Sequence, residues 1–403
     1  MRKDSRDAVA EGVIRWGPID RETVAAPAPA LELLTRAIAV QPDNPALHAR
    51  LAGIHIDHFD FAAAAAALET ALRLDPAAPR IPERLARCYN GLRRHEDALA
   101  VLASDAGTPR FERGVAYLEL GSTESAEQEF RAVLDADPGH RHACWKLCKL
   151  LRAGGRAAET LVLCEDLHTR GAAHAQLFYD WGLALALTGD EARARALLFD
   201  PRRVRALALP VPAGFPDLAS FNAALAGEIL ANPYRLSDFP VDEEANRGSA
   251  RVHQLLAGRR PELVRLLMES LQTLVASSPT PMVGDFDPWA RARPRAAHLK
   301  AWGLIQRGGD HEAWHTHRGG WLSGVYYVRV PKSVSARGAG RGCIEFGPPP
   351  ALAKAKPGFI PNWRHAPKPG TLLLAPSHFP HRTIPTGARE HRLSIAFDVV
   401  PDA

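Results

Sequence analysis

Three histidines in the last quarter of the chain are the side chains best suited to chemistry. His315 and His317 are separated by one residue, and His381 lies in a later segment. Residues i and i+2 of an extended segment point to the same side, so His315 and His317 can face one metal ion. A third ligand from a distant strand completes a facial triad and leaves the opposite positions of an octahedral metal open. The spacing therefore predicts a metal site made of His315, His317 and His381.

An arginine follows these histidines at a spacing that suits a return strand. Arg392 comes 11 residues after His381, and Ser394 follows Arg392 at i+2. A guanidinium grips a carboxylate through a bidentate, charge-assisted pair of hydrogen bonds, and a hydroxyl on the same side can add a donor. Together these residues predict a site that holds a metal ion, a bidentate oxoacid and O2.

The residues around this site follow a β pattern. From residue 298 onward, short apolar runs with period 2 alternate with Gly/Pro turns, as in HLKAWGLIQR, LSGVYYVRV, GCIEFG, GTLLLAPS and HRLSIAFDVV. Short strands with such turns are typical of an antiparallel sandwich or barrel, and a jelly roll is the natural candidate.

From residue 298 the sequence resembles the 2-oxoglutarate/Fe(II) oxygenases related to prolyl hydroxylases. The matching segments are HTHRGGWLSGVYYV, GCIEF, KPGTLLLAPSHFPHRTIP and RLSIAF. The resemblance implies a double-stranded β-helix with Fe(II) as metal and 2-oxoglutarate as cosubstrate. It also implies His315 as the first ligand, His381 as the distal one, and Arg392 with Ser394 as the grip on the far carboxylate of 2-oxoglutarate.

The second ligand departs from the family pattern, which has Asp or Glu where this chain has His317. We favour a three-histidine site, because neutral imidazole is a good Fe(II) ligand. Alternatively, His317 is the first ligand and Gly319 occupies the carboxylate position, which leaves a coordination gap. A third alternative recruits a nearby carboxylate, from Asp310, Glu312 or Glu345.

Aromatic residues surround the predicted site. Tyr326 and Tyr327 must face opposite sides of a strand, and we predict that Tyr326 contacts the oxoacid. Trp302, Trp314 and Trp321 could shape a substrate entrance, but packing in the core or at its rim is the ordinary role of such residues.

The first half of the chain is a repeat. Asp-Pro or Pro-Asp pairs recur at residues 42, 75, 137 and 200, and Pro76 follows Pro42 by 34 residues. Each interval holds two helical segments, such as 46–56 and 61–74. A period of about 34 residues with helix, turn, helix and a terminal proline resembles the tetratricopeptide repeat. The resemblance implies an α-solenoid whose groove binds a protein or peptide partner.

We therefore expect a multidomain protein: a tail at 1–27, repeats at 28–205 and an oxygenase domain at 206–403. That domain divides into a helical lead-in at 206–297 and a jelly-roll core at 298–403. The proline-rich stretch at 210–216 ends the helical periodicity. The expected activity is that of a dioxygenase that hydroxylates a protein, a peptide or a small molecule. The alternative is an adaptor with an inactive jelly roll.

The composition of the chain argues against several classes of partner and site. The net charge is only +5, and Lys and Arg are scattered, so we expect no nucleic-acid partner. No stretch approaches the ~20 apolar residues of a membrane span. The five cysteines form no CxxC pair, which argues against a disulfide framework or a zinc knuckle. These features predict a cytoplasmic protein.

Overall fold

A computed structural model of the protein describes residues 14–19, 27–103, 110–233, 235–236, 245–256, 261–280, 282–334 and 340–402. The predicted N-terminal tail lies mostly outside these residues. Contacts divide the chain into two compact units, Val24–Arg156 on one side and Met1–Thr23 with Ala157–Ala403 on the other.

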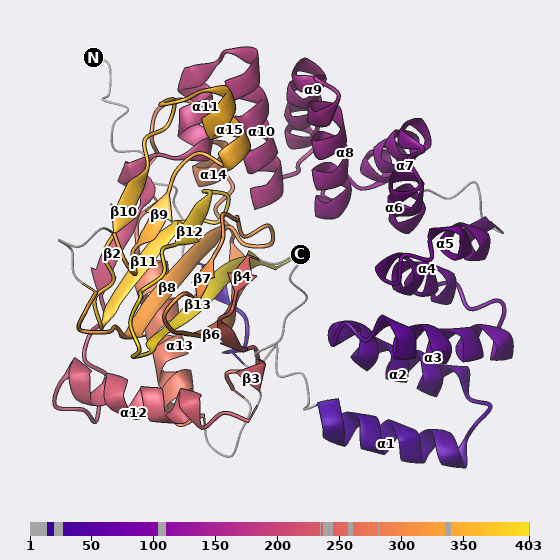
Figure 1. The fold of residues 1–403 in the computed structure, drawn as a ribbon, viewed down its shortest axis with the longest axis horizontal. Helices are drawn as coiled ribbons and strands as arrows, with labels where there is room; N and C mark the ends of the chain where they lie inside the picture. The colour runs from indigo at the N-terminus through magenta and orange to yellow at the C-terminus, as the bar shows by residue number, and fades with distance from the viewer. Residues whose placement is uncertain are drawn as a thin grey trace. The chain divides into compact units, whose positions relative to one another are not determined.

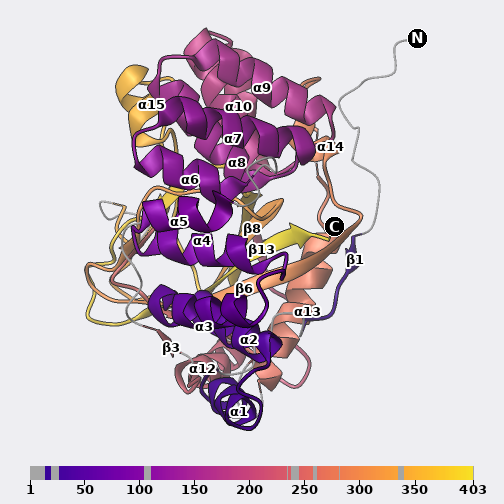
Figure 2. The same cartoon turned by 90° about the vertical axis from the view of Figure 1, so that its right-hand side faces the viewer.

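The Val24–Arg156 unit consists of helices packed in consecutive pairs (Figures 1 and 2). Its helices are α1 (Pro27–Val40), α2 (Pro45–Asp57), α3 (Phe61–Leu74), α4 (Ile81–Gly91), α5 (His95–Leu102), α6 (Phe111–Glu119), α7 (Thr123–Ala136) and α8 (Arg141–Ala153). The helices expected at 46–56 and 61–74 are α2 and α3. The repeat architecture is thereby confirmed.

The recurring Asp-Pro pairs terminate helices by a common mechanism. The carboxylate of Asp75 accepts the backbone N–H of Ala77 at 3.1 Å, and that of Asp137 accepts the N–H of Gly139 at 3.0 Å. Proline between donor and acceptor has no N–H and cannot continue a helix. Each Asp thus caps a turn through its own side chain, which explains why the pair recurs at the end of a repeat.

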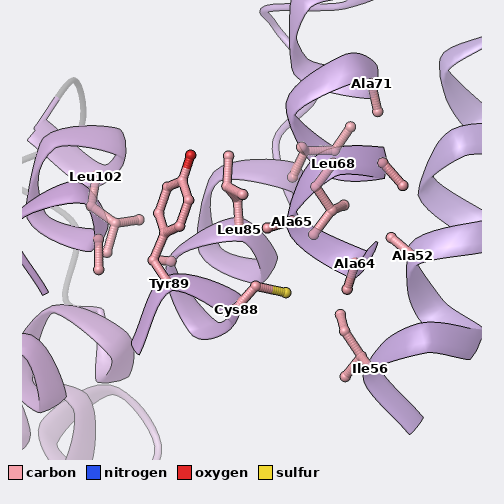
Figure 3. Packing of buried hydrophobic residues seen from close by; sticks show 14 of the residues in the cluster. Ala52, Ile56, Ala64, Ala65, Leu68, Ala71, Leu85, Cys88, Tyr89 and Leu102 are labelled. Atoms are coloured by element: carbon pink, nitrogen blue, oxygen red, sulfur yellow. The ribbon is translucent and has the colours of Figure 1, made fainter. Parts of the chain in front are cut away.

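Small residues allow the paired helices to approach closely. Figure 3 shows Ala64, Ala65 and Leu68 of α3 packed between α2 and α4. At Gly114 of α6, a Cβ atom would lie 2.6 Å from the Phe130 ring of α7. The glycine at this position is therefore required by packing.

We expect Gly114→Ala to lower the free energy of unfolding of the helical unit by about 1–2 kcal/mol. The new methyl overpacks the α6–α7 contact at a cost of about 1–3 kcal/mol, and the better helix propensity of alanine returns only up to ~1 kcal/mol. Thermal unfolding followed by circular dichroism measures the change. The control is Gly227→Ala in helix α12 (Leu218–Leu230), where a Cβ meets nothing within 4 Å and the substitution should be stabilising. A stabilising Gly114→Ala would contradict the close contact.

The second unit begins with helices α9 (Ala157–Thr169), α10 (Ala175–Thr188) and α11 (Glu191–Leu198) and a 3-10 turn, η4 (Pro201–Arg203). The sequence places these helices in the repeat array up to residue 205, whereas the contacts group them with the β domain. Aromatic packing accounts for this grouping. The Phe199 ring, which follows α11, stacks on Phe346 with centroids 5.8 Å apart, and Phe178 of α10 contacts His378 at 5.5 Å.

Two sheets form the β domain (Figure 1). The main sheet has the order β2 (Arg205–Ala208), β11 (Thr371–Pro376), β8 (Leu322–Arg329), β13 (Arg392–Pro401), β6 (Ala296–Gln306), β5 (Ala250–Val252) and β3 (Arg235–Leu236), and β1 (Arg15–Trp16) pairs with β6. The minor sheet has the order β10 (Trp363–His365), β9 (Ile344–Phe346) and β12 (His381–Thr383). A separate pair joins β4 (Asn246–Arg247) to β7 (His311–Glu312). The five strands expected from the sequence are all present, as β6, β8, β9, β11 and β13, so the predicted fold class is confirmed.

The main sheet has two buried faces. Its outer face packs against α12 (Leu218–Leu230), which in turn contacts α13 (Glu262–Ser277). The outer face carries Phe397, and a Cβ on Gly324 of β8 would lie 2.3 Å from that ring. The inner face carries Arg392, Ser394 and Asp398, which alternate with the outer residues along β13.

The region before β6 is only partly helical. Helices α12 and α13 lie in the predicted helical lead-in, but strands β3, β4 and β5 lie there too. Strands of two or three residues are too short to show a period in the sequence. Short helices α14 (Pro288–Arg291) and α15 (Pro350–Ala355) complete the unit. Across the described segments, every helix is too short or too polar to cross a membrane.

Candidate metal centre

Backbone pairing brings the three histidines together. His315 and His381 form an antiparallel bridge, in which each N–H donates to the other's carbonyl at 2.9 and 3.0 Å. The N–H of His317 donates to the Ser377 carbonyl at 2.8 Å. The His315–His317 segment is thus attached to the connection between β11 and β12. This attachment explains how residues distant in sequence reach one point.

The three imidazoles converge on one another. Their ring centroids lie 4.3 Å apart for His315 and His381, and 5.1 Å apart for each pair that includes His317. One nitrogen from each ring lies within 4.8 Å of the others, and the Nε2 atoms of His315 and His317 are 3.2 Å apart. This is the separation expected of donors that share one cation.

The opposite ring nitrogens are held by acceptors. Nδ1 of His315 donates to the carbonyl of Ala313 at 2.7 Å, and Nδ1 of His381 donates to that of Phe379 at 2.9 Å. Nδ1 of His317 donates to Oδ1 of Asp398 at 2.6 Å. Since these partners can only accept, each Nδ1 carries the proton and each Nε2 keeps a free lone pair. The donor set therefore fits a divalent transition metal.

The electrostatics favour neutral ligands. Burial lowers the pKa of His315 well below its usual value, and the His381 and His317 rings lower it further. Burial also lowers the pKa of His381, to about 3. For His317 burial acts in the same direction, but the charge and hydrogen bond of Asp398 together with Glu312 raise its pKa overall. His315 and His381 are thus neutral at physiological pH, the form that binds metals.

The competing carboxylates have other partners. Glu345 is fully buried and pairs with Arg364 at 2.7 Å and Arg382 at 2.5 Å. Glu312 pairs with Arg251 at 2.9 Å, and Asp310 accepts the backbone N–H of Arg307. The structure places none of these three carboxylates, nor Gly319, in the imidazole cluster of the described residues.

Arg392 is a buried cation on the same face as Asp398. Its side chain is 2% exposed. Nε donates to Oε1 of Gln306 at 2.9 Å, Nη2 contacts the same oxygen, and Nη1 donates to the Gly342 carbonyl at 2.7 Å. Among the described residues no carboxylate forms an ion pair with this guanidinium. Burial lowers the pKa of this guanidinium.

The prediction of Tyr326 as an oxoacid contact is wrong. The Tyr326 hydroxyl donates to Oδ1 of Asn222 in α12 at 2.7 Å, so this residue packs on the outer face. Tyr327 takes the inner face, where it is the cross-strand partner of Ser394 and lies in the field of Arg392. Burial raises the pKa of Tyr327, so its hydroxyl stays protonated.

The three tryptophans have different roles. Trp302 on β6 stacks against the His317 ring, with centroids 5.6 Å apart and planes at 28°. Trp321 is buried and stacked on Trp289 at 4.9 Å, so it belongs to the core. Trp314 lies beneath the Arg382 guanidinium, 5.1 Å from ring centroid to charge. Only Trp302 of the three contacts a histidine of the cluster in the described chain.

Family models match both parts of the chain. Residues 300–398 match the family described as "Putative 2OG-Fe(II) oxygenase". Residues 56–107 match one tetratricopeptide-repeat model, and 101–141 and 111–159 match another. A comparison with curated proteins gives no match.

Solved structures resemble each part in fold. A prolyl-4-hydroxylase of Pseudomonas putida is 15% identical over 50% of this chain and 94% of its own, with a TM-score of 0.33. The non-haem α-ketoglutarate-dependent epimerase SnoN from nogalamycin biosynthesis is 17% identical over 52% and 81%, with a TM-score of 0.34. MamA from Desulfovibrio magneticus RS-1 is 16% identical over 36% and 84%, with a TM-score of 0.32.

The region matched by the oxygenase model contains the histidine cluster and the buried arginine. Its fold is the two-sheet arrangement expected from the sequence. The C-terminal part of this chain is a domain of the 2-oxoglutarate/Fe(II) oxygenase family, joined to tetratricopeptide repeats.

Proposed function

We propose that this protein is an Fe(II)/2-oxoglutarate-dependent dioxygenase of the hydroxylase type. The observation that carries the proposal is the convergence of three imidazole Nε2 lone pairs in a domain where the buried Arg392 has no carboxylate partner among the described residues. His315, His317 and His381 would hold Fe(II) through neutral nitrogens, an arrangement that leaves coordination positions open.

When bound, Fe(II) would activate O2 for oxidative decarboxylation of 2-oxoglutarate, coupled to oxidation of a C–H bond. One O2 and one 2-oxoglutarate give succinate, CO2 and a hydroxylated product. The protein contributes placement of the reactants and exclusion of water.

Arg392 would bind the far carboxylate of 2-oxoglutarate. A buried guanidinium without an anion is costly, and a dicarboxylate supplies the missing charge through charge-assisted hydrogen bonds. Ser394 and Tyr327 lie beside Arg392 on the inner face, and their hydroxyls can donate to the same ligand. Gln306 already fixes one edge of the guanidinium and so orients it.

Trp302 would shape the space next to the metal. Its ring stacks on His317 and is only half-buried, so one part of it stays available to a substrate. A flat aromatic wall can exclude water and position a C–H bond.

The repeats would bind a protein or peptide, which makes a polypeptide the favoured substrate. A small-molecule substrate, with the repeats serving assembly, is the competing hypothesis. An adaptor with an inactive jelly roll is the non-enzymatic alternative.

Succinate formation distinguishes these functions. We expect the full-length protein with Fe(II), ascorbate and 2-oxoglutarate to release succinate, and a pool of peptides to stimulate release several-fold more than a metabolite extract. Nuclear magnetic resonance of the reaction mixture measures succinate directly. If only the metabolite extract stimulates succinate release, the substrate is a small molecule rather than a polypeptide. No succinate from a protein that binds Fe(II) and 2-oxoglutarate, with either pool, would favour the adaptor.

A further inference from the structure

A buried carboxylate lies directly behind one of the three imidazoles. Oδ1 of Asp398 accepts the Nδ1–H of His317 at 2.6 Å and the hydroxyl of Ser323 at 2.6 Å. The Ser323 hydroxyl also lies 2.7 Å from that of Ser377. The side chains of His317 and Asp398 are only 10% and 11% exposed. The pair is thus part of an inner hydrogen-bonded network rather than a surface ion pair.

The other two imidazoles lack such a partner. His315 and His381 each donate to a neutral backbone carbonyl, that of Ala313 and that of Phe379. The carboxylate therefore stands behind the residue that replaces the usual Asp or Glu ligand of this family. With histidine at position 317, no carboxylate would be bound directly to the metal. Asp398 places a negative charge at hydrogen-bond distance from His317 instead.

The backbone is shaped to admit this network. A Cβ at Gly320 would lie 2.5 Å from Oγ of Ser377 and 3.0 Å from Cβ of Asp398. Only glycine fits there without displacing the two side chains. Gly320 thus keeps open the space that Ser377 and Asp398 occupy.

We propose that Asp398 is a positioning residue that makes the three-histidine centre competent, by orienting His317 and supplying the charge that a direct carboxylate ligand would bring. A carboxylate that accepts the outer N–H of a ligand histidine fixes the ring and its tautomer and raises its basicity. The inference rests on the proposed function for the identity of the metal, but metal affinity tests it without turnover.

The decisive variant is Asp398→Asn, which keeps the shape and an acceptor oxygen but removes the charge. We expect it to weaken Co(II) binding, measured by calorimetry on the full chain, by about 10- to 100-fold. Asp402→Asn is the matched control. Asp402, which follows β13, accepts Nδ1–H of His298 on β6 at 2.9 Å, and this second His–Asp pair is outside the imidazole cluster. Its Co(II) affinity should equal that of the wild type.

A spectroscopic readout separates positioning from general stability. The Co(II) protein should show exchangeable, paramagnetically shifted proton resonances from the ligand N–H groups. Asp398→Asn should shift one of them, or make it exchange faster, and Asp402→Asn should leave all of them in place. Unchanged affinity together with unchanged resonances in Asp398→Asn would overturn the proposal.

Two further outcomes are distinct. If the wild type binds Co(II) and Asp398→Asn loses affinity, but the wild type forms no succinate, the proposed function fails and the role of Asp398 stands. If Asp398→Asn does not fold, Ser323→Ala decides, because it removes one hydrogen bond to the carboxylate and keeps the charge. We expect Ser323→Ala to lower Co(II) affinity by about two- to ten-fold, and an unchanged affinity would overturn the proposal.

Discussion

His381→Ala should abolish specific metal binding, lowering Fe(II) affinity by more than about 100-fold, because loss of a direct ligand exceeds the 10- to 100-fold cost of losing a group behind one. The fold should survive, since the bridge between His315 and His381 is made by backbone atoms that alanine retains. Anaerobic calorimetry with Fe(II), and metal content after dialysis, measure the loss.

His311→Ala is the matched control for this experiment. In both residues Nδ1 donates to a carbonyl two positions earlier, Gly309 for His311 and Phe379 for His381. His311, however, is outside the imidazole cluster. Equal metal affinity in His381→Ala and the wild type would show that the ligand set is wrong. Three imidazoles can also bind zinc, so retention of Zn(II) in preference to Fe(II) would contradict the oxygenase assignment.

Arg392→Met should abolish 2-oxoglutarate binding while leaving metal affinity intact. Truncating one partner of a buried, charge-assisted pair costs about 2–5 kcal/mol, which corresponds to roughly 30- to several-thousand-fold in affinity. The apo protein should be as stable as the wild type or more so, because a buried, unpaired charge is replaced by an apolar chain of similar length. Calorimetric titration of the Mn(II)-loaded protein with 2-oxoglutarate measures the effect, and thermal unfolding measures stability.

Arg203→Met tests the reasoning about buried charge. Arg203 is also buried, but it pairs with Asp287 at 2.7 Å, and both side chains are at most 1% exposed. Removing it leaves the buried Asp287 carboxylate without its counter-ion, and we expect a loss of about 3–5 kcal/mol. If Arg392→Met were as destabilising as Arg203→Met, Arg392 would be a structural residue rather than a ligand-binding one.

Local patterns in the sequence were sufficient for much of the fold. Period-2 alternation predicted β8, β11 and β13, because these strands are long enough to show it. The histidine spacing predicted which rings come together, since residues i and i+2 share a side. The three-residue strand β12 carries little pattern of its own. The family resemblance is what identified its segment.

Tyr326 shows a limit of the period-2 pattern, which does not reveal which face of a strand carries the site. Adjacent residues on a strand face opposite sides, but the sequence does not mark which side is inner when both are buried. Here the outer face packs on α12, and Asn222 satisfies the Tyr326 hydroxyl. An apolar period alone therefore could not separate Tyr326 from Tyr327.

Asp398 was missed for a different reason. Its partner His317 lies 81 residues earlier, and their contact depends on how β13, β8 and β11 pair. The signal that could have found it is the even spacing of Asp398 from Arg392 and Ser394, which places all three on one face of the predicted strand. The grouping of α9, α10 and α11 with the β domain likewise depends on tertiary aromatic packing that a helical period does not encode.

Strand β13 carries both the arginine proposed to bind the cosubstrate and the aspartate proposed to support the metal, on one face and in one register. The backbone of this one strand therefore sets the distance between the proposed metal site and the proposed cosubstrate site. Inserting a single residue between Ser394 and Asp398 would move either Arg392 or Asp398 to the outer face, which packs on α12, while the other side chain stayed on the inner face. A substitution at Arg392 or Asp398 changes one of the two sites, whereas a change in the spacing between these residues changes both.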